Sequence, residues 1–220
     1  MQVTARQLAA DIDVTPSRIS ELVHAAEQHR PDVVQRRSEW KMKQKHFEAT
    51  RLVFLDESGV NTGMTRLYGR AVKHKRVIEA VPDARFHRTM ILSSIRMDGT
   101  MVPFVFEGAK NGDLFQAHVS QWLAPSLKPG DIVVMDNLSS HKVSGVIEAI
   151  EAAGASVMFL PPYSPDLNPI ELMWSKIKAI LRKLKVRAKA LLDDAIACAF
   201  NNISLSDISA WFKHDGYALC

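Results

Sequence analysis

Two short apolar runs in this 220-residue chain each end directly before an aspartate. Leu52–Leu55 (LVFL) precedes Asp56, and Ile132–Met135 (IVVM) precedes Asp136. Short apolar runs of this kind, bounded by polar residues, are typical of buried strands. Because open α/β sheets bind ligands beyond the ends of their strands, we expect the two aspartates at one edge of a sheet.

From residue 51 onward the sequence continues as short apolar runs separated by turns and predicted helices. The further predicted elements are a hairpin (Thr89–Ile95 and Val102–Phe106, turning at Asp98-Gly99), a helix at Asp113–Leu123, a helix near Val143–Ala153, a strand at Ser156–Leu160 and a long helix from Pro169. Antiparallel strands come first, and strands alternating with helices follow. This order predicts an α/β fold, a mixed sheet flanked by helices.

The N-terminal part has a different residue pattern, which predicts helices rather than strands. Residues 4–27 predict two short helices, with Thr15 as a helix N-cap and Pro16 as the first helical residue. This is either a helix-turn-helix-like segment, with Arg18 as a candidate DNA contact, or a helical hairpin without DNA contact. Residues 31–50 are polar and basic and predict a helix or linker. We therefore expect three parts: 1–30, 31–50 and a main domain at 51–220.

Composition excludes several classes of protein. The chain has two cysteines, Cys198 and Cys220, and no cluster of Cys and His, so neither a disulfide framework nor a zinc site is expected. No apolar stretch is long enough for a membrane span, and the N-terminus lacks the layout of a secretory signal. We therefore expect a cytoplasmic protein. Its net charge of +4 is only a weak indication of polyanionic partners.

A third acid, Glu171, opens the helix predicted from Pro169. The segment between Asp136 and Glu171 is long enough for one helix, one strand and a return to the same sheet edge. Asp56, Asp136 and Glu171 are thus candidate catalytic residues and metal ligands. Phosphodiester hydrolysis can use two divalent ions, and Mg²⁺ prefers such carboxylate oxygens to His or Cys. We expect Mg²⁺ as the cofactor, with Mn²⁺ able to replace it.

Each acid also has a structural explanation. Asp56 and Asp136 can be turn-forming residues, because Asp often hydrogen-bonds local backbone after a strand. Glu171 occupies the third position of a capping box, with Asn168 as N-cap and Pro169 as the first helical residue. The functional interpretation depends on the coincidence of all three acids.

Basic residues follow Glu171 on the predicted helix. At 100° per residue, four of them fall within about 40° of the Glu171 face. These are Lys178, Arg182, Lys185 and Lys189. They are either a surface that contacts DNA phosphates near the acids or an ordinary solvated face.

Four sequence blocks resemble, in order and spacing, the catalytic domain of bacterial insertion-sequence transposases of the Tc/mariner superfamily. The blocks are LVFLDESGV, MTRLYGRA, PGDIVVMDNLSSHK and LPPYSPDLNPIELMWSKIKA. The resemblance covers about residues 30–220 and implies an RNase-H-like fold with a magnesium-dependent acid triad at Asp56, Asp136 and Glu171. It also implies cleavage at transposon ends, followed by transfer of the freed 3′-hydroxyl to target DNA, often at a TA dinucleotide.

The resemblance adds further expectations. Asn137, His141 and the Tyr163–Pro169 loop match family motifs, and His141 is either a DNA or water contact or a plain loop residue. The partner is double-stranded DNA, and a homodimer would bring paired ends together. Relatives carry paired helix-turn-helix modules, for which the region before residue 51 is too short. We therefore expect a shortened N-terminus. The alternatives are an inactive or truncated DNA-binding remnant and another RNase-H-like nuclease such as a resolvase.

Overall fold

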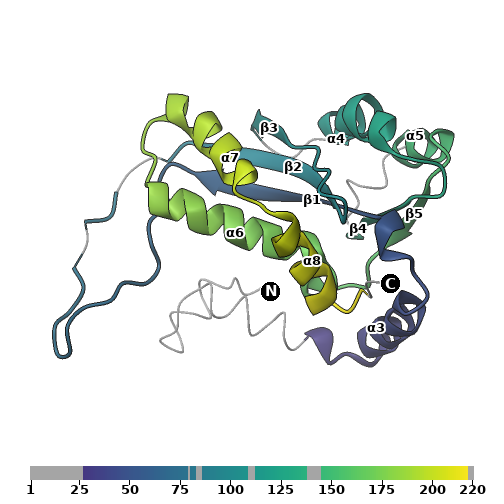
Figure 1. The fold of residues 1–220 in the computed structure, drawn as a ribbon, viewed down its shortest axis with the longest axis horizontal. Coiled ribbons are helices and arrows are strands. Elements are labelled where there is room, and N and C mark those ends of the chain that lie inside the picture. Colours follow the sequence, from purple (N-terminus) through teal and green to yellow (C-terminus); the bar gives the residue numbers. More distant parts are fainter. Residues whose placement is uncertain (1–26, 79, 83–85, 109–111, 138–144, 218–220) are drawn as a thin grey trace, which may run out of the picture.

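A five-stranded mixed β-sheet forms the centre of the computed structural model, which describes residues 27–217 except 79, 83–85, 109–111 and 138–144 (Figure 1). Its strands are β1 (Leu52–Asn61), β2 (Arg88–Arg96), β3 (Phe104–Glu107), β4 (Ile132–Met135) and β5 (Ser156–Phe159), in the spatial order β3-β2-β1-β4-β5. β2 pairs antiparallel with both β1 and β3, whereas β4 pairs parallel with both β1 and β5. The expected mixed sheet is confirmed.

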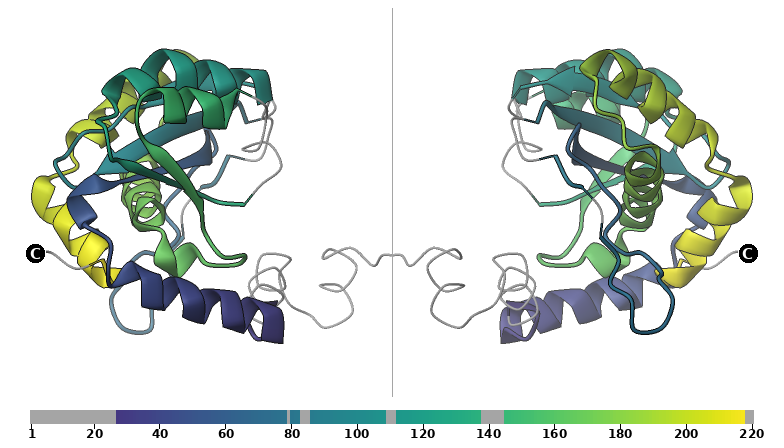
Figure 2. Two further views of the ribbon diagram at one scale, coloured as in Figure 1. Left: turned by 90° about the vertical axis from the view of Figure 1, so that its right-hand side faces the viewer. Right: turned by 90° about the vertical axis from the view of Figure 1, so that its left-hand side faces the viewer.

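Helices cover both faces of this sheet (Figures 1 and 2). They are α4 (Gly112–His118), α5 (Val146–Ala152), α6 (Pro169–Leu184), α7 (Leu192–Asn201) and α8 (Leu205–His214). A further helix, α3 (Pro31–Gln44), lies away from the faces of the sheet. Successive side chains of a strand point to opposite faces. Accordingly, Leu52 and Phe54 of β1 pack with α6, α7 and α8, whereas Val53 and Leu55 pack with α4 and α5.

Asp56 lies inside β1 rather than directly after a strand, so the expected strand end at Leu55 is wrong. β1 pairs with β4 only at Leu52–Phe54, but it pairs with β2 as far as Asn61. The antiparallel partner therefore extends the strand beyond its apolar run. Continuing the β1–β4 register by two residues sets Asp56 beside Asp136, which directly follows β4.

Most elements expected from the sequence are present. The β2–β3 hairpin turns at Asp98-Gly99, where Gly99 has a positive φ of 91°, and α6 begins at Pro169. α7 and α8 were not predicted, although Ser204 and Asp207 form a capping box at the start of α8. These two helices complete the hydrophobic core behind α6.

Some expectations fall on parts of the chain that the structure does not describe. The helix-turn-helix-like segment with Arg18 lies almost wholly in residues 1–26, and His141 lies in 138–144, both outside the described residues. Residues 31–44 are helical, and this helix, α3, packs into the main core through Trp40. Within the described ranges, no helix is long and apolar enough to cross a membrane.

Candidate active site

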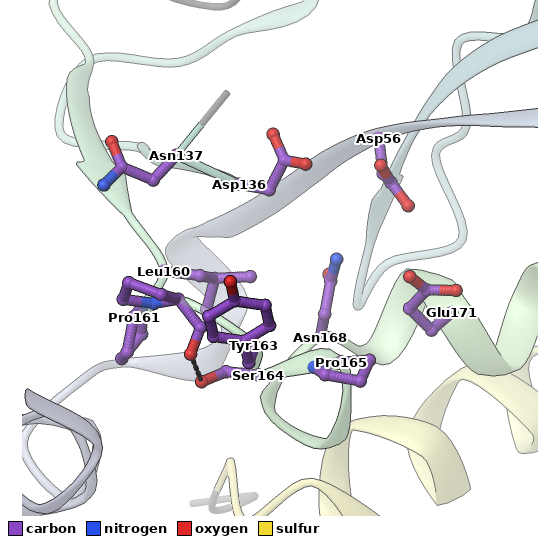
Figure 3. Close-up of a pocket in the computed structure, with 11 residues that line it drawn as sticks. Asp56, Asp136, Asn137, Leu160, Pro161, Tyr163, Ser164, Pro165, Asn168 and Glu171 are labelled. Carbon is purple, nitrogen blue, oxygen red and sulfur yellow. Dashed lines mark hydrogen bonds between the residues drawn. The ribbon is translucent and has the colours of Figure 1, made fainter. Parts of the chain in front are cut away.

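A pocket of about 560 Å³ opens beside β1, β4 and the start of α6 (Figure 3). Asp56, Asp136 and Glu171, here called the pocket acids, all line it, together with Asn137 and side chains from residues 160–168. The fold therefore brings to one cavity three carboxylates that are far apart in the sequence.

Each pocket acid reaches the cavity from a different element. Asp56 projects from β1 toward α6, where its Oδ2 accepts a hydrogen bond of 3.1 Å from Trp174 Nε1. Asp136 follows the last residue of β4, and Glu171 belongs to the first turn of α6. Figure 3 shows the carboxylates of Asp56 and Glu171 turned toward one another, with Asp136 on the adjacent wall. A sheet edge and a helix start thus form two sides of one acidic site.

Burial and like charge oppose ionisation of two of these carboxyl groups, those of Asp56 and Glu171. Asp56 is only 9% exposed. Desolvation, reinforced by the nearby charges of Glu171 and Asp136, raises the pKa of Asp56 from 3.8 to about 7, although the Trp174 hydrogen bond acts in the opposite direction. Desolvation also raises the pKa of Glu171, with Lys178 opposing and Asp136 adding to the shift. A bound cation would favour the ionised form of all three acids.

The capping box proposed as the alternative role of Glu171 is not formed. Asn168 is the N-cap of α6 by its backbone position, but in the described chain its side chain makes no capping hydrogen bond. Instead, the Glu171 backbone N–H donates to the Asn168 backbone carbonyl at 3.0 Å. The capping explanation is therefore wrong, and both side chains line the pocket.

The pocket offers side-chain oxygens that suit a hard divalent cation, but the acidic side chains do not converge on a single position for an ion. Among the residues that the structure describes, no three His, Cys, Asp or Glu side chains are placed to hold one ion together. The buried Oδ1 of Asn168 has no hydrogen-bond partner in the same part of the chain. Carboxylate and amide oxygens are ligands of Mg²⁺ and Ca²⁺. The chemistry of these side chains fits such a cation.

Comparison with known families shows what kind of domain carries this pocket. Residues 51–192 match the family model described as DDE superfamily endonuclease. The chain belongs to the DDE superfamily endonucleases. The matched segment runs from the start of β1 to the start of α7 and includes all three pocket acids.

Individual relatives agree with this family. The transposable element Tcb1 transposase of Caenorhabditis briggsae is 28% identical over 90 residues, which is 41% of this chain and 31% of that protein. The Mos1 mariner paired end complex with Mn has a TM-score of 0.67 at 16% identity, covering 96% of this chain and 71% of that chain. The catalytic domain of Mos1 mariner transposase gives 0.54 at 15% identity, covering 80% of each chain. The expected RNase-H-like fold is confirmed.

In this DDE endonuclease, α3 holds the loop at residues 163–166, which forms one wall of the acid pocket. Tyr163 has a positive φ of 54°, a strained conformation for a residue with a side chain. Its carbonyl accepts hydrogen bonds from Arg37 Nη1 at 3.1 Å and Gln28 Nε2 at 2.7 Å. Arg37 also donates to Ser164 Oγ at 2.8 Å and to both carboxylate oxygens of Asp166 at 2.9 and 2.7 Å. Arg37 of α3 and Gln28 thus hold the loop at residues 163–166 in place on the pocket wall.

Replacing Arg37 by Ala is expected to destabilise the DDE endonuclease by about 1–3 kcal/mol, because hydrogen bonds to charged groups contribute on this scale. Partial burial opposes ionisation of Asp166, but Arg37 outweighs it and lowers the pKa of that carboxyl. Arg37→Lys should lie between Ala and wild type, since an ammonium cannot reproduce the planar fork. Urea unfolding measures the effect, with Arg36→Ala as the neighbouring control. Equal stability of both Ala variants would contradict the role of Arg37.

The predicted row of basic residues along α6 is shorter than expected. α6 ends at Leu184, and Lys185 adopts a left-handed conformation with a φ of 52°. Lys185 and Lys189 therefore do not continue the helical face, and Lys189 Nζ instead pairs with Glu107 at 2.5 Å. Lys178 and Arg182 remain on α6, and Lys178 is close enough to lower the pKa of Glu171.

Sequence reasoning missed a second group of basic residues beside the pocket. A smaller hollow of about 200 Å³ is lined by Arg36, Lys43 and Glu39 of α3 and shares Asn137 and residues 160–162 with the acid pocket. The basic character of residues 31–50 was the available signal. Only the packing of α3 shows that these charges adjoin the site of this DDE endonuclease.

Proposed function

We propose that this chain is a DNA transposase domain that catalyses metal-dependent cleavage and strand transfer at transposon ends. The observation that carries the proposal is the meeting of Asp56, Asp136 and Glu171 in one pocket of a DDE endonuclease domain. The Tcb1 relative is named a transposase, and the Mos1 structures are described as paired-end and strand transfer complexes. These names support DNA ends as the substrate.

The pocket acids would hold Mg²⁺ or Mn²⁺. When bound, divalent cations supply a nucleophile at neutral pH and stabilise charge on the phosphate and the leaving oxygen. The chain's own residues position the carboxylates that would hold the cation. Trp174 orients Asp56, and the register of β1 and β4 sets Asp136 beside it. The loop held by Arg37 closes the opposite wall. Among the related solved structures are Mos1 complexes with Mn and with Mg, which supports these two ions as probes.

The finer parts of the proposal follow the sequence motifs. We propose an insertion-sequence element of the Tc/mariner superfamily as the origin, double-stranded transposon ends and target DNA as partners, and a homodimer as the form that holds two ends. The N-terminal segment at 1–30 would contribute to DNA recognition, residues 51–220 would form the catalytic domain, and the cytoplasm would be its compartment. Four motif blocks in order and spacing support the superfamily and, through it, DNA as the partner.

Cleavage of supercoiled plasmid DNA tests the function. The purified chain is expected to nick the plasmid in Mg²⁺ or Mn²⁺ and to stop when a chelator is added. Asp136→Ala should remove the activity, because a pocket carboxylate is lost while the strand before it is unchanged. Nicking that persists at the same rate in Asp136→Ala would show a contaminating nuclease and contradict the proposal.

Neutralising Lys178 and Arg182 together is expected to weaken DNA binding at every sequence. Each lost phosphate contact should reduce the slope of log affinity against log salt by roughly 0.9. The matched control is Lys189→Gln, because the charge of Lys189 is already paired with Glu107. Binding titrations at several salt concentrations give the slopes. A slope for the double variant equal to that of the control would remove α6 from the DNA surface.

A further inference from the structure

Asn168 occupies a helix N-cap but does not act as one. Asn at this position normally accepts a hydrogen bond from the backbone of the first helical turn. The side chain of Asn168 makes no such bond, whereas Ser204, the N-cap of α8, accepts one from the Asp207 N–H at 3.2 Å. The Asn168 amide is therefore available for another task.

The amide oxygen of Asn168 is also buried without a partner. The residue is 4% exposed, and no donor in the described part of the chain reaches its Oδ1. Buried polar groups are normally hydrogen-bonded, and leaving one unsatisfied costs stability. Unsatisfied groups of this kind in native proteins often mark a site for an ion, a water or a catalytic function.

The position of the side chain indicates which function applies. Asn168 lines the acid pocket, and Figure 3 shows its amide standing in the hollow bounded by Asp56, Asp136 and Glu171. The oxygen and nitrogen of an amide are nearly equal in size, so a half-turn of the group presents either atom to the pocket without repacking its neighbours. A neutral oxygen adds a ligand without adding to the repulsion among three carboxylates.

We propose that the amide oxygen of Asn168 is a fourth protein ligand of the divalent cation held by the pocket acids. This inference rests on the proposed cation-dependent function of the same pocket. It assigns a cation-binding role to a residue that the sequence marks as a helix N-cap within the motif loop at Tyr163–Pro169. Amide carbonyls are accepted ligands of hard divalent cations beside carboxylates.

Two measurements on the full chain test the assignment, Mn²⁺ titration followed by electron paramagnetic resonance and thermal unfolding without divalent ions. Asn168→Ala is expected to weaken Mn²⁺ binding by at least about 10-fold, the scale found when groups supporting a metal are removed. Its midpoint of unfolding without Mn²⁺ should equal or exceed that of wild type, because no cap is lost and an unsatisfied oxygen is removed. Asn168→Asp should restore binding.

Ser204→Ala is the matched control, since it removes a cap that is formed. Its midpoint of unfolding should fall by about 2–4 °C, with Mn²⁺ binding unchanged. The proposal is overturned if Asn168→Ala behaves like Ser204→Ala, losing stability while binding Mn²⁺ like wild type. If wild type itself binds no Mn²⁺, the proposed function fails together with the inference; if wild type binds and Asn168→Ala binds equally, only the inference fails.

Discussion

Replacing Asp56 by Asn is expected to reduce metal-dependent DNA nicking at least about 1,000-fold. Stabilisation of phosphate charge by metal ions contributes several kcal/mol, and about 1.4 kcal/mol corresponds to a factor of ten in rate. Asn keeps the size of the side chain and an acceptor for the Trp174 indole, so the fold should be retained. The loss would therefore report the missing carboxylate charge.

Glu57→Gln provides the matched control, because Glu57 is the next residue of the same strand. Side chains along β1 alternate between the two faces of the sheet, so Glu57 lies on the same face as Val53 and Leu55, which pack with α4 and α5. The charge of Glu57 acts on the pKa of His118 in α4 rather than on the acid pocket. Removing this carboxylate should leave nicking close to wild type. Similar losses in Asp56→Asn and Glu57→Gln would show that strand stability, not the pocket, controls the activity.

The metal-free protein is expected to lose stability as the pH rises from 5 to 8. The pKa of Asp56 is about 7 in the folded protein against an ordinary value of 3.8, because burial and the neighbouring acids disfavour its charge. The folded state therefore binds this proton more tightly than the unfolded chain does. The stabilisation is complete below the ordinary pKa and is lost as the pH rises through about 7. The contribution is a few kcal/mol, at most about 4.

Urea unfolding of wild type and Asp56→Asn at pH 5 and pH 8 separates this effect from other titrations. Asp56→Asn lacks the ionising group, so its stability should change less across the range, and at pH 8 it should be the more stable of the two without metal. Adding Mg²⁺ or Mn²⁺ at pH 8 should stabilise wild type more than the variant. Parallel pH profiles of the two proteins would contradict a raised pKa at Asp56.

Local patterns predicted much of the architecture. Four-residue apolar runs located β4 and the start of β1, Asp98-Gly99 located the hairpin turn, and Pro169 located the start of α6. These features depend on residues close together in the chain, where side-chain periodicity and turn chemistry act directly. The coincidence of two aspartates after apolar runs with a glutamate at a helix start also identified the three carboxylates that the pocket brings together.

Other features depend on distant partners and could not be read in this way. β1 runs to Asn61 because β2 pairs with it, although its apolar run stops at Leu55. The basic row on α6 was extrapolated past Leu184, where Lys185 turns the chain out of the helix. The role of α3 was hidden because Arg37 contacts residues 126 to 129 positions further along the chain.

The sequence by itself determined the α/β class, the two apolar runs that end before Asp56 and Asp136, and the three acids that form the candidate site. Only the tertiary structure decided that Asn168 faces the pocket instead of capping α6, that α3 braces the pocket loop, and that desolvation raises the pKa of Asp56. The physical reason is that strand and helix propensities arise from near neighbours. Burial, electrostatic environment and the choice among hydrogen-bond partners are set by segments that meet only when the chain has folded.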